Sequence, residues 1–150
     1  MGLALLAGVA GLLATLGSAP GQGSEAPKFL HALDNAPLEF DLRPNQTYTP
    51  AVEAFHQTAE NPYRGDPEAI AAGKKIYGKY CKACHLDSGK GRIGPSLVDD
   101  KWKYARTGTD QGKFEIIYAG GAGAMQAFGL RMDQDDILKV MAYLDVLGKN

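Results

Sequence analysis

The chain has 150 residues, of which 45% are hydrophobic, a formal net charge of -1 and two cysteines. This length allows one domain with an ordinary apolar core, and the near-neutral net charge gives no sign of nucleic-acid binding. The charge is uneven, because residues 69–113 carry ten basic and four acidic side chains whereas residues 25–68 carry three and eight. The basic block is either a solvated lysine-rich helix face or a docking surface for an acidic partner.

The N-terminal stretch MGLALLAGVAGLLATLGSA is apolar, carries no charged side chain and ends in small residues. This pattern is typical of an export signal, so we expect residues 1–24 to be a signal peptide cleaved somewhere between residues 17 and 26. An uncleaved anchor helix is the alternative, because the run is near the lower length limit for crossing a bilayer. A cleaved signal predicts an exported protein with no stable membrane anchor.

The segment 25–65 is rich in proline, which removes backbone donors and restricts the preceding residue. We therefore predict an extended arm that packs over the rest of the chain. A short strand near Leu38–Leu42 and a helical turn near Val52–Thr58 are expected within it. Its histidines, His31 and His56, are expected to be surface or capping residues rather than metal ligands.

A helix is predicted from residue 66 to about residue 81. Asp66 suits the N-cap, Pro67 the first helical position and Glu68 the positive end of the helix dipole. Apolar side chains then follow the helical period. Gly73 lowers intrinsic helix stability, which indicates that another helix crosses closely at this position.

Residues 79–86 read KYCKACHL and hold both cysteines, Cys81 and Cys84, followed directly by His85. Two thiols at this spacing can each add across one vinyl group of the same porphyrin, and the next imidazole can then bind the iron. The order C-x-x-C-H therefore predicts covalent attachment of one haem c. A redox disulfide normally opens a helix in a βαβ unit, and structural zinc requires four ligands. The chain offers neither such a unit nor a second cysteine pair.

Residues 86–112 are rich in glycine and lysine, and we expect mostly loop that turns around the edge of a porphyrin. Pro95 lies ten residues after the motif histidine and is a candidate to accept a hydrogen bond from its second ring nitrogen. Trp102 either packs on the haem and donates to a propionate or is a core aromatic. Arg92 or Arg106 could also pair with a propionate, with an exposed arginine as the alternative.

A short helix is predicted at residues 113–119, and a glycine-rich loop with one thioether, Met125, follows it. A soft sulfur ligand on a loop beyond the motif histidine suits the second axial position of the iron. Met132 and Met141 compete for this role. Met141 has the helical spacing of a core residue, and Met132 stands just before a predicted helix cap.

The final helix is predicted to start with Asp133 as its N-cap and to run to about Leu147, with Gly148 as the stop. Its apolar face is suited to cross the first predicted helix at Gly73. That crossing would close a small helical shell around the haem.

Residues 66–148 carry, in order, C-K-A-C-H from Cys81, G-P-S-L from Gly94, M-Q-A-F from Met125 and an amphipathic C-terminal helix. This set resembles the class I c-type cytochromes. The resemblance implies an all-α fold of helices wrapped around one covalently bound haem, with residues 66–150 as the cytochrome c domain. It also implies His85 and Met125 as the axial ligands, although the usual Met-Pro of the family appears here as Met125-Gln126.

Three further stretches are N-P-Y-R-G at residues 61–65, G-P-S-L-V-D-D at residues 94–100 with Trp102 after it, and G-G-A-G-A-M-Q-A-F at residues 120–128. Together they resemble the cytochrome cL group. That resemblance implies a periplasmic electron acceptor of a quinoprotein methanol dehydrogenase, of the calcium- or the lanthanide-dependent type. Some members of the group carry a calcium ion near the haem, for which this sequence shows no evident cage of carboxylates.

An iron bound by both imidazole and thioether has no open site for oxygen, peroxide or substrate. We therefore expect an electron-transfer protein rather than an enzyme. The resemblance implies a periplasmic monomer that takes electrons in a transient complex from a PQQ-dependent methanol or alcohol dehydrogenase. It would pass them to another soluble cytochrome or an oxidase. The alternatives are a c-type cytochrome that serves another respiratory donor, and a haem enzyme or gas sensor with an open sixth site.

Overall fold

The computed structural model describes Met1 and residues 25–149. Its helices are α1 (Pro50–Thr58), α2 (Pro67–Tyr80), α3 (Lys82–His85), the 3-10 helix η1 (Ala105–Gly108), α4 (Asp110–Ala119) and α5 (Gln134–Leu144). The described part of the chain forms no strand, as expected for an all-α fold. No helix within these residues has the length and apolar character needed to cross a membrane. The predicted signal peptide falls on residues 2–24, outside the described residues.

Helices α2 and α5 cross closely, and the crossing point is the predicted Gly73. A Cβ atom at this glycine would lie only 2.0 Å from the carbonyl oxygen of Lys139, so the two backbones are nearly in contact. One helical turn further on, the rings of Tyr77 and Tyr143 meet edge to face with centroids 5.3 Å apart. This crossing sets the direction in which α2 delivers the chain to the cysteines.

The predicted helix starts are largely confirmed. The Asp66 carboxylate accepts hydrogen bonds from the amides of Glu68 and Ala69 at 2.8 and 2.9 Å, which caps α2. Asp133 does occupy the N-cap position of α5, but its side chain makes no capping bond and instead pairs with Arg43 of the arm.

Helix α5 ends at Leu144, three residues before the predicted end at Leu147. The amides of Val146 and Leu147 both donate to the carbonyl of Tyr143, so the chain continues as a tight turn. Gly148 follows with φ +82°, the left-handed conformation that suits a helix stop.

The strand predicted at Leu38–Leu42 is wrong. Within the described residues, β-pairing is limited to one isolated antiparallel bridge between Leu30 and Pro37. Beyond the bridge the backbone bonds to a side chain instead, because the amide of Asp41 donates to the hydroxyl of Tyr118 at 3.1 Å. Because Pro37 has no amide hydrogen to donate, the bridge is not extended into a ladder of paired residues.

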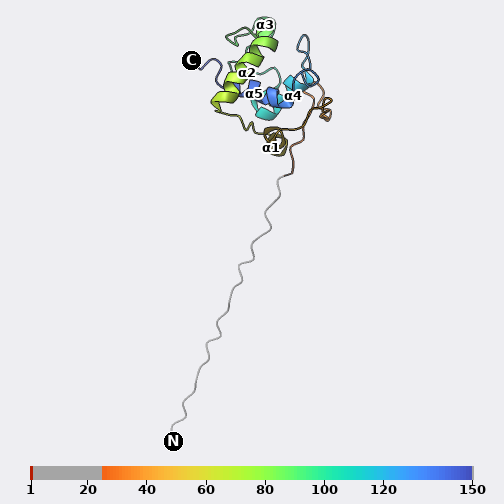
Figure 1. The fold of residues 1–150 in the computed structure, drawn as a ribbon, viewed down its shortest axis with the longest axis vertical. Helices are drawn as coiled ribbons and strands as arrows, with labels where there is room; N and C mark the ends of the chain where they lie inside the picture. Colours follow the sequence, from red (N-terminus) through yellow and green to blue (C-terminus); the bar gives the residue numbers. More distant parts are fainter. Residues whose placement is uncertain (2–24, 150) are drawn as a thin grey trace.

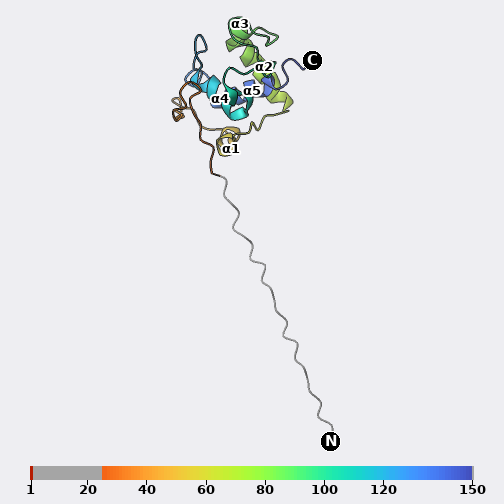
Figure 2. The same cartoon turned by 180° about the vertical axis from the view of Figure 1, so that it is seen from behind.

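The arm does more than cover the surface, because its aromatic side chains form part of the core. Phe55 of α1 is fully buried, and its ring centroid lies 4.7 Å from that of Phe114 in α4. His56 is not the predicted surface or capping residue. Its ring stacks on Phe40 at 4.6 Å, and its Nε2 lies 2.7 Å from Oε1 of Gln134. In both views α1 and α3 lie at opposite ends of the helical part of the chain (Figures 1 and 2).

Candidate haem site

A cavity of about 450 Å³ opens between α2, α5 and the loops that follow α3 and α4. It brings together the site residues predicted from the sequence, except the two propionate candidates Arg92 and Arg106. The lining includes Cys81, Cys84, His85, Pro95, Trp102 and Met125. Residues separated by more than forty positions in the chain therefore share one enclosed space.

The cysteines and the histidine are placed by a break between two helices. Helix α2 ends at Tyr80, and Cys81 forms the junction to the single turn of α3. The carbonyl of Cys81 accepts from the amides of both Cys84 and His85, at 3.1 and 3.0 Å. Burial, with a smaller contribution from Cys84, raises the pKa of the Cys81 thiol to about 11, so this thiol is uncharged at neutral pH.

The buried imidazole of His85 is fixed from two sides. Its Nδ1 donates to the carbonyl oxygen of Pro95 at 2.9 Å, which is the hydrogen bond predicted from the sequence. A Cβ atom at Gly94 would lie 2.5 Å from Cε1 of the ring, so only glycine allows the loop to approach this closely. The bond at Nδ1 leaves Nε2 as the nitrogen that can bind a metal.

The loop after α3 is held by backbone bonds to the motif itself. The amides of Arg92 and Gly94 both donate to the carbonyl of Cys84 at 3.1 Å, and Gly91 donates to that of His85 at 3.1 Å. The side chain of Arg92 is exposed and points to the carbonyl of Ala83 at 3.4 Å. Arg92 is absent from the cavity lining, so the predicted contact with a propionate finds no support there.

Met125 is half-buried and lines the cavity. Its competitors do not, because Met132 and Met141 are 3% and 1% exposed within the hydrophobic core. Among the methionines of the described chain, Met125 is thus the one whose thioether can reach a group in the cavity.

Trp102 is half-buried and lines the cavity, with its ring 3.3 Å from the position of a Cβ atom at Gly108. Arg106, the other propionate candidate, is engaged elsewhere. Its Nε donates at 2.9 Å to the fully buried carboxylate of Glu115. This pair could not be predicted from the sequence, because a buried glutamate on a short helix has the same sequence pattern as an exposed one.

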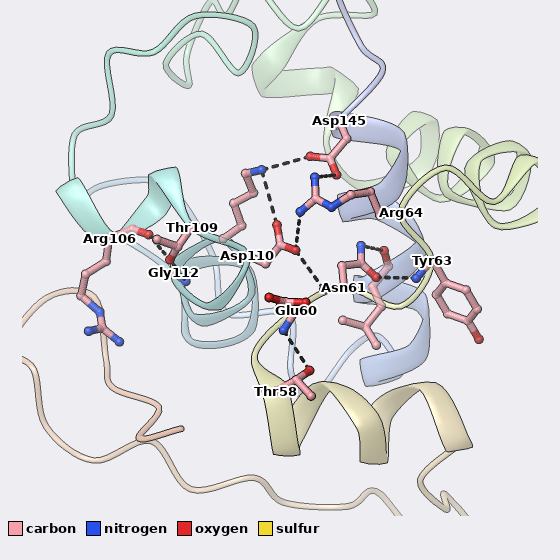
Figure 3. Close-up of polar contacts among 12 residues, drawn as sticks. Thr58, Glu60, Asn61, Tyr63, Arg64, Arg106, Thr109, Asp110, Gly112 and Asp145 are labelled. Atoms are coloured by element: carbon pink, nitrogen blue, oxygen red, sulfur yellow. Dashed lines mark hydrogen bonds and ion pairs between the residues drawn. The ribbon is translucent and has the colours of Figure 1, made fainter. Parts of the chain in front are cut away.

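The segment N-P-Y-R-G is tied to the cavity wall by a polar network (Figure 3). Arg64 donates to Asp110 at 2.6 Å and to Asp145 at 2.8 Å, and Lys113 donates to Asp145 at 3.1 Å. The amide of Asn61 also donates to Asp110, at 2.9 Å. Lys113 and Asp145 line the cavity, so the network joins α4 and α5 along one of its sides.

Among the described residues, no group of three or more His, Cys, Asp or Glu side chains is arranged to hold a metal ion. This part of the chain therefore gives the calcium ion raised by the resemblance no support from clustered carboxylates.

The donor set fits a covalently held haem. Two thiols from one turn, a buried imidazole with one nitrogen available and a thioether from a distant loop face the same cavity. This combination of ligands is that of a His/Met haem with two cysteine attachments.

The part of the chain that forms this site matches known proteins. The family model described as "Cytochrome C oxidase, cbb3-type, subunit III" matches residues 68–144. The curated cytochrome c-L of Methylorubrum extorquens is 33% identical over 96 residues, which are 64% of this chain and 49% of that protein. The chain therefore spans about half the length of this relative.

Two solved structures share the fold. The crystal structure of cytochrome cL from Methylophaga aminisulfidivorans has 34% identity and a TM-score of 0.76, with 79% of each chain covered. That of cytochrome cL from Hyphomicrobium denitrificans has 32% identity and a TM-score of 0.76, with 81% of this chain and 73% of that chain covered.

Proposed function

Because the chain belongs to the class I c-type cytochromes and, within them, to the cytochrome cL group, we propose that it carries electrons in the periplasm. Its donor in this proposal is a PQQ-dependent methanol or alcohol dehydrogenase, and its acceptor is a further cytochrome or an oxidase. Proteins of this family transfer electrons rather than catalyse reactions, and this chain is an electron-transfer protein.

The observation that carries the proposal is the convergence of four donor side chains on one cavity. In this proposal Cys81 and Cys84 would hold haem c through thioether bonds, and His85 and Met125 would bind its iron. When bound, haem c supplies a one-electron carrier whose potential a thioether ligand raises. With both of these side chains on the iron, no position would remain there for a substrate.

The other residues orient these donors and limit the access of water. The Pro95 carbonyl keeps the His85 proton on Nδ1 and so fixes the ring orientation. Trp102 covers one edge of the cavity. The fixed geometry requires little rearrangement when an electron arrives or leaves, which suits a shuttle between two larger partners.

The surface beside the cavity supports a brief encounter with a partner. Exposed Lys101, Lys103 and Lys149 line the cavity mouth, together with Ile93, which is 64% exposed. Two exposed aspartates, at residues 99 and 100, lie there as well. A small apolar contact ringed by charges is typical of transient redox complexes, in which charge accelerates the encounter more than it strengthens the complex.

The direct test mixes the oxidised, haem-loaded protein with purified methanol dehydrogenase and methanol. Haem reduction, followed by the change in visible absorption, is expected at a rate proportional to dehydrogenase concentration. If the haem stays oxidised with methanol dehydrogenase but is reduced by another quinoprotein or by a respiratory complex, the donor is wrong and the electron-carrier assignment stands.

A second experiment tests the docking surface. Lys103→Glu should slow reduction by the dehydrogenase, and the rate of the unchanged protein should fall as salt rises. Lys74→Glu is the matched control, because Lys74 is equally exposed on α2 but does not line the cavity. Equal effects of the two substitutions would show that net charge, and not this surface, governs the encounter.

A further inference from the structure

The loop that carries Met125 leaves α4 and returns to the same end of it. Backbone amides on both sides of the loop donate to the last carbonyls of this helix: Gly120 to Ile116 at 3.0 Å, Phe128 to Ile117 at 3.0 Å and Gly129 to Tyr118 at 2.9 Å. These bonds fix the two ends of the loop. They do not fix its tip, which projects beyond the helix toward the cavity.

The tip is tied to a different part of the chain. The amide of Ala122 donates to the hydroxyl oxygen of Tyr104 at 2.9 Å, three residues before Met125. Within the tip itself, one backbone bond joins the amide of Gly121 to the carbonyl of Met125 at 3.1 Å. Tyr104 and Met125 both line the cavity, so the phenol holds the loop from a separate segment of the cavity lining.

Tyr104 is itself held against α4. Its carbonyl accepts from the amide of Thr107 at 2.9 Å, which joins it to η1. A Cβ atom at Gly112 would lie 1.9 Å from the carbonyl oxygen of Arg106, so η1 rests directly on the first turn of α4. This close contact leaves the phenol little freedom to follow a moving loop.

The buried carboxylate of Glu115 fixes η1 and the arm together. It accepts from Nε of Arg106 at 2.9 Å, from the amide of Leu30 at 2.9 Å and from Nε2 of Gln111 at 3.0 Å. A fully buried charge is stable only when it is paired and hydrogen-bonded in this way. The same Gln111 amide group donates to the carbonyl of Lys28 at 2.7 Å, which adds a second tie to the arm.

We propose that Tyr104, supported by the Arg106–Glu115 pair, is a positioning residue that keeps the Met125 loop closed over the haem. This inference rests on the proposed role of Met125 as an axial ligand. Tyr104 does not bind the iron, and it acts only through the loop. The arm contributes through the amide of Leu30, which donates to the carboxylate of Glu115. This bond links the arm to the support of the Met125 loop.

The test compares two tyrosines that each lose one hydrogen bond. Tyr104→Phe removes the bond to Ala122 and keeps the ring, whereas Tyr63→Phe removes a 2.7 Å bond to Asp135 away from the cavity. Carbon monoxide can bind the reduced iron only when the thioether has left it, so its binding rate reports the open fraction of the loop. Loss of one hydrogen bond should raise this rate about fivefold in Tyr104→Phe and leave it unchanged in Tyr63→Phe.

A second variant, Arg106→Lys, weakens the support of η1 without touching the loop and should raise the rate by a smaller factor. Unchanged carbon monoxide binding in Tyr104→Phe, or an equal increase in Tyr63→Phe, would overturn the proposal. A different result is expected if the underlying assumption, that Met125 binds the iron, is wrong. If Met125→Leu keeps the long-wavelength absorption band of a thioether–iron bond, Met125 is not the ligand and the proposed site is wrong.

Discussion

The two sides of the cavity are built in different ways. The histidine wall, residues 81–95, is held by hydrogen bonds among its own residues, such as those from Arg92 and Gly94 to the carbonyl of Cys84. The methionine wall, residues 120–129, depends on partners outside it, including α4 and Tyr104. The histidine wall therefore takes most of its hydrogen bonds from one short stretch, with added support from α2, where the Tyr77 hydroxyl donates to the carbonyl of Leu86 at 2.7 Å. The methionine wall takes its geometry from the folded core.

This difference suits the two proposed ligands. A histidine that directly follows two attached cysteines would stay close to the iron even when the rest of the chain shifts. A methionine on a separate loop stays bound only while its supports hold. We therefore expect changes in the core and the arm to act first on the methionine side.

The largest expected effect is the loss of one axial ligand. Met125→Leu keeps the volume of the side chain but removes the sulfur, so the long-wavelength absorption band should disappear and carbon monoxide should bind the reduced protein at once. Met141→Leu is the control, because Met141 is buried and does not line the cavity. It should keep the band and cost less than about 1.5 kcal/mol of stability. If Met141→Leu loses the band and Met125→Leu keeps it, the axial ligand is Met141 in the core and not Met125.

The support of the histidine wall can be broken at the helix crossing. Gly73→Ala places a Cβ atom 2.0 Å from a backbone carbonyl of α5, so α2 must shift, and the free energy of unfolding should fall by about 3 kcal/mol. Gly78→Ala, on the same helix with no atom within 4 Å of the new Cβ, should stabilise the protein by about 0.5 to 1 kcal/mol. Denaturant unfolding of the haem-loaded proteins measures both. Equal free energies of unfolding for Gly73→Ala and Gly78→Ala would contradict the close crossing of α2 and α5.

A local change tests the histidine wall itself. Gly94→Ala would press a methyl group onto the His85 ring and should destabilise the protein by about 2 kcal/mol, with a lower yield of haem-loaded protein. The adjacent Ile93→Ala serves as control, because Ile93 is 64% exposed and its loss should change stability little. If Gly94→Ala leaves both stability and the thioether band unchanged, the ring is not held by this contact.

The contrast between the walls also explains what the sequence predicted. Cys81, Cys84, His85 and the Pro95 bond follow from spacing, because their partners lie within a few residues. Met125 could be selected because it lies in a glycine-rich loop, whereas its competitors have the patterns of core or cap residues. Its role as an iron ligand stays a prediction.

The errors share one physical cause, which is a partner that the local sequence pattern does not indicate. Arg106 pairs with the buried Glu115, and His56 stacks in a cluster that joins the arm to α4. Tyr104 went unnoticed for the same reason, since nothing near it in the sequence indicates the amide of Ala122. Only packing of the whole chain brings these groups together.

The arm beneath the methionine wall should make stability depend on pH. Burial lowers the pKa of His56 below its usual 6.5, only partly offset by the bond to Gln134, so the unfolded chain binds a proton more readily than the folded one. The stability that the neutral His56 contributes is complete above pH 6.5. It is lost as the pH falls through the lower pKa of His56 in the folded state. Unfolding measured between pH 7 and pH 5 should show a shallower loss of stability in His56→Gln. If the stability of His56→Gln and that of the unchanged protein fall equally with pH, His56 is not a source of the pH dependence.

The smallest effect is expected at Arg92, which lies on the histidine wall but outside the cavity. Its backbone amide makes the structural bond to Cys84, and its exposed guanidinium makes only a 3.4 Å contact with the carbonyl of Ala83. Arg92→Ala keeps the amide, so the free energy of unfolding should change by less than about 0.5 kcal/mol and the reduction potential should stay unchanged. A clear drop in potential or stability would mean that the guanidinium reaches a propionate after all. In that case the histidine wall, too, would depend on a contact that its own backbone does not provide.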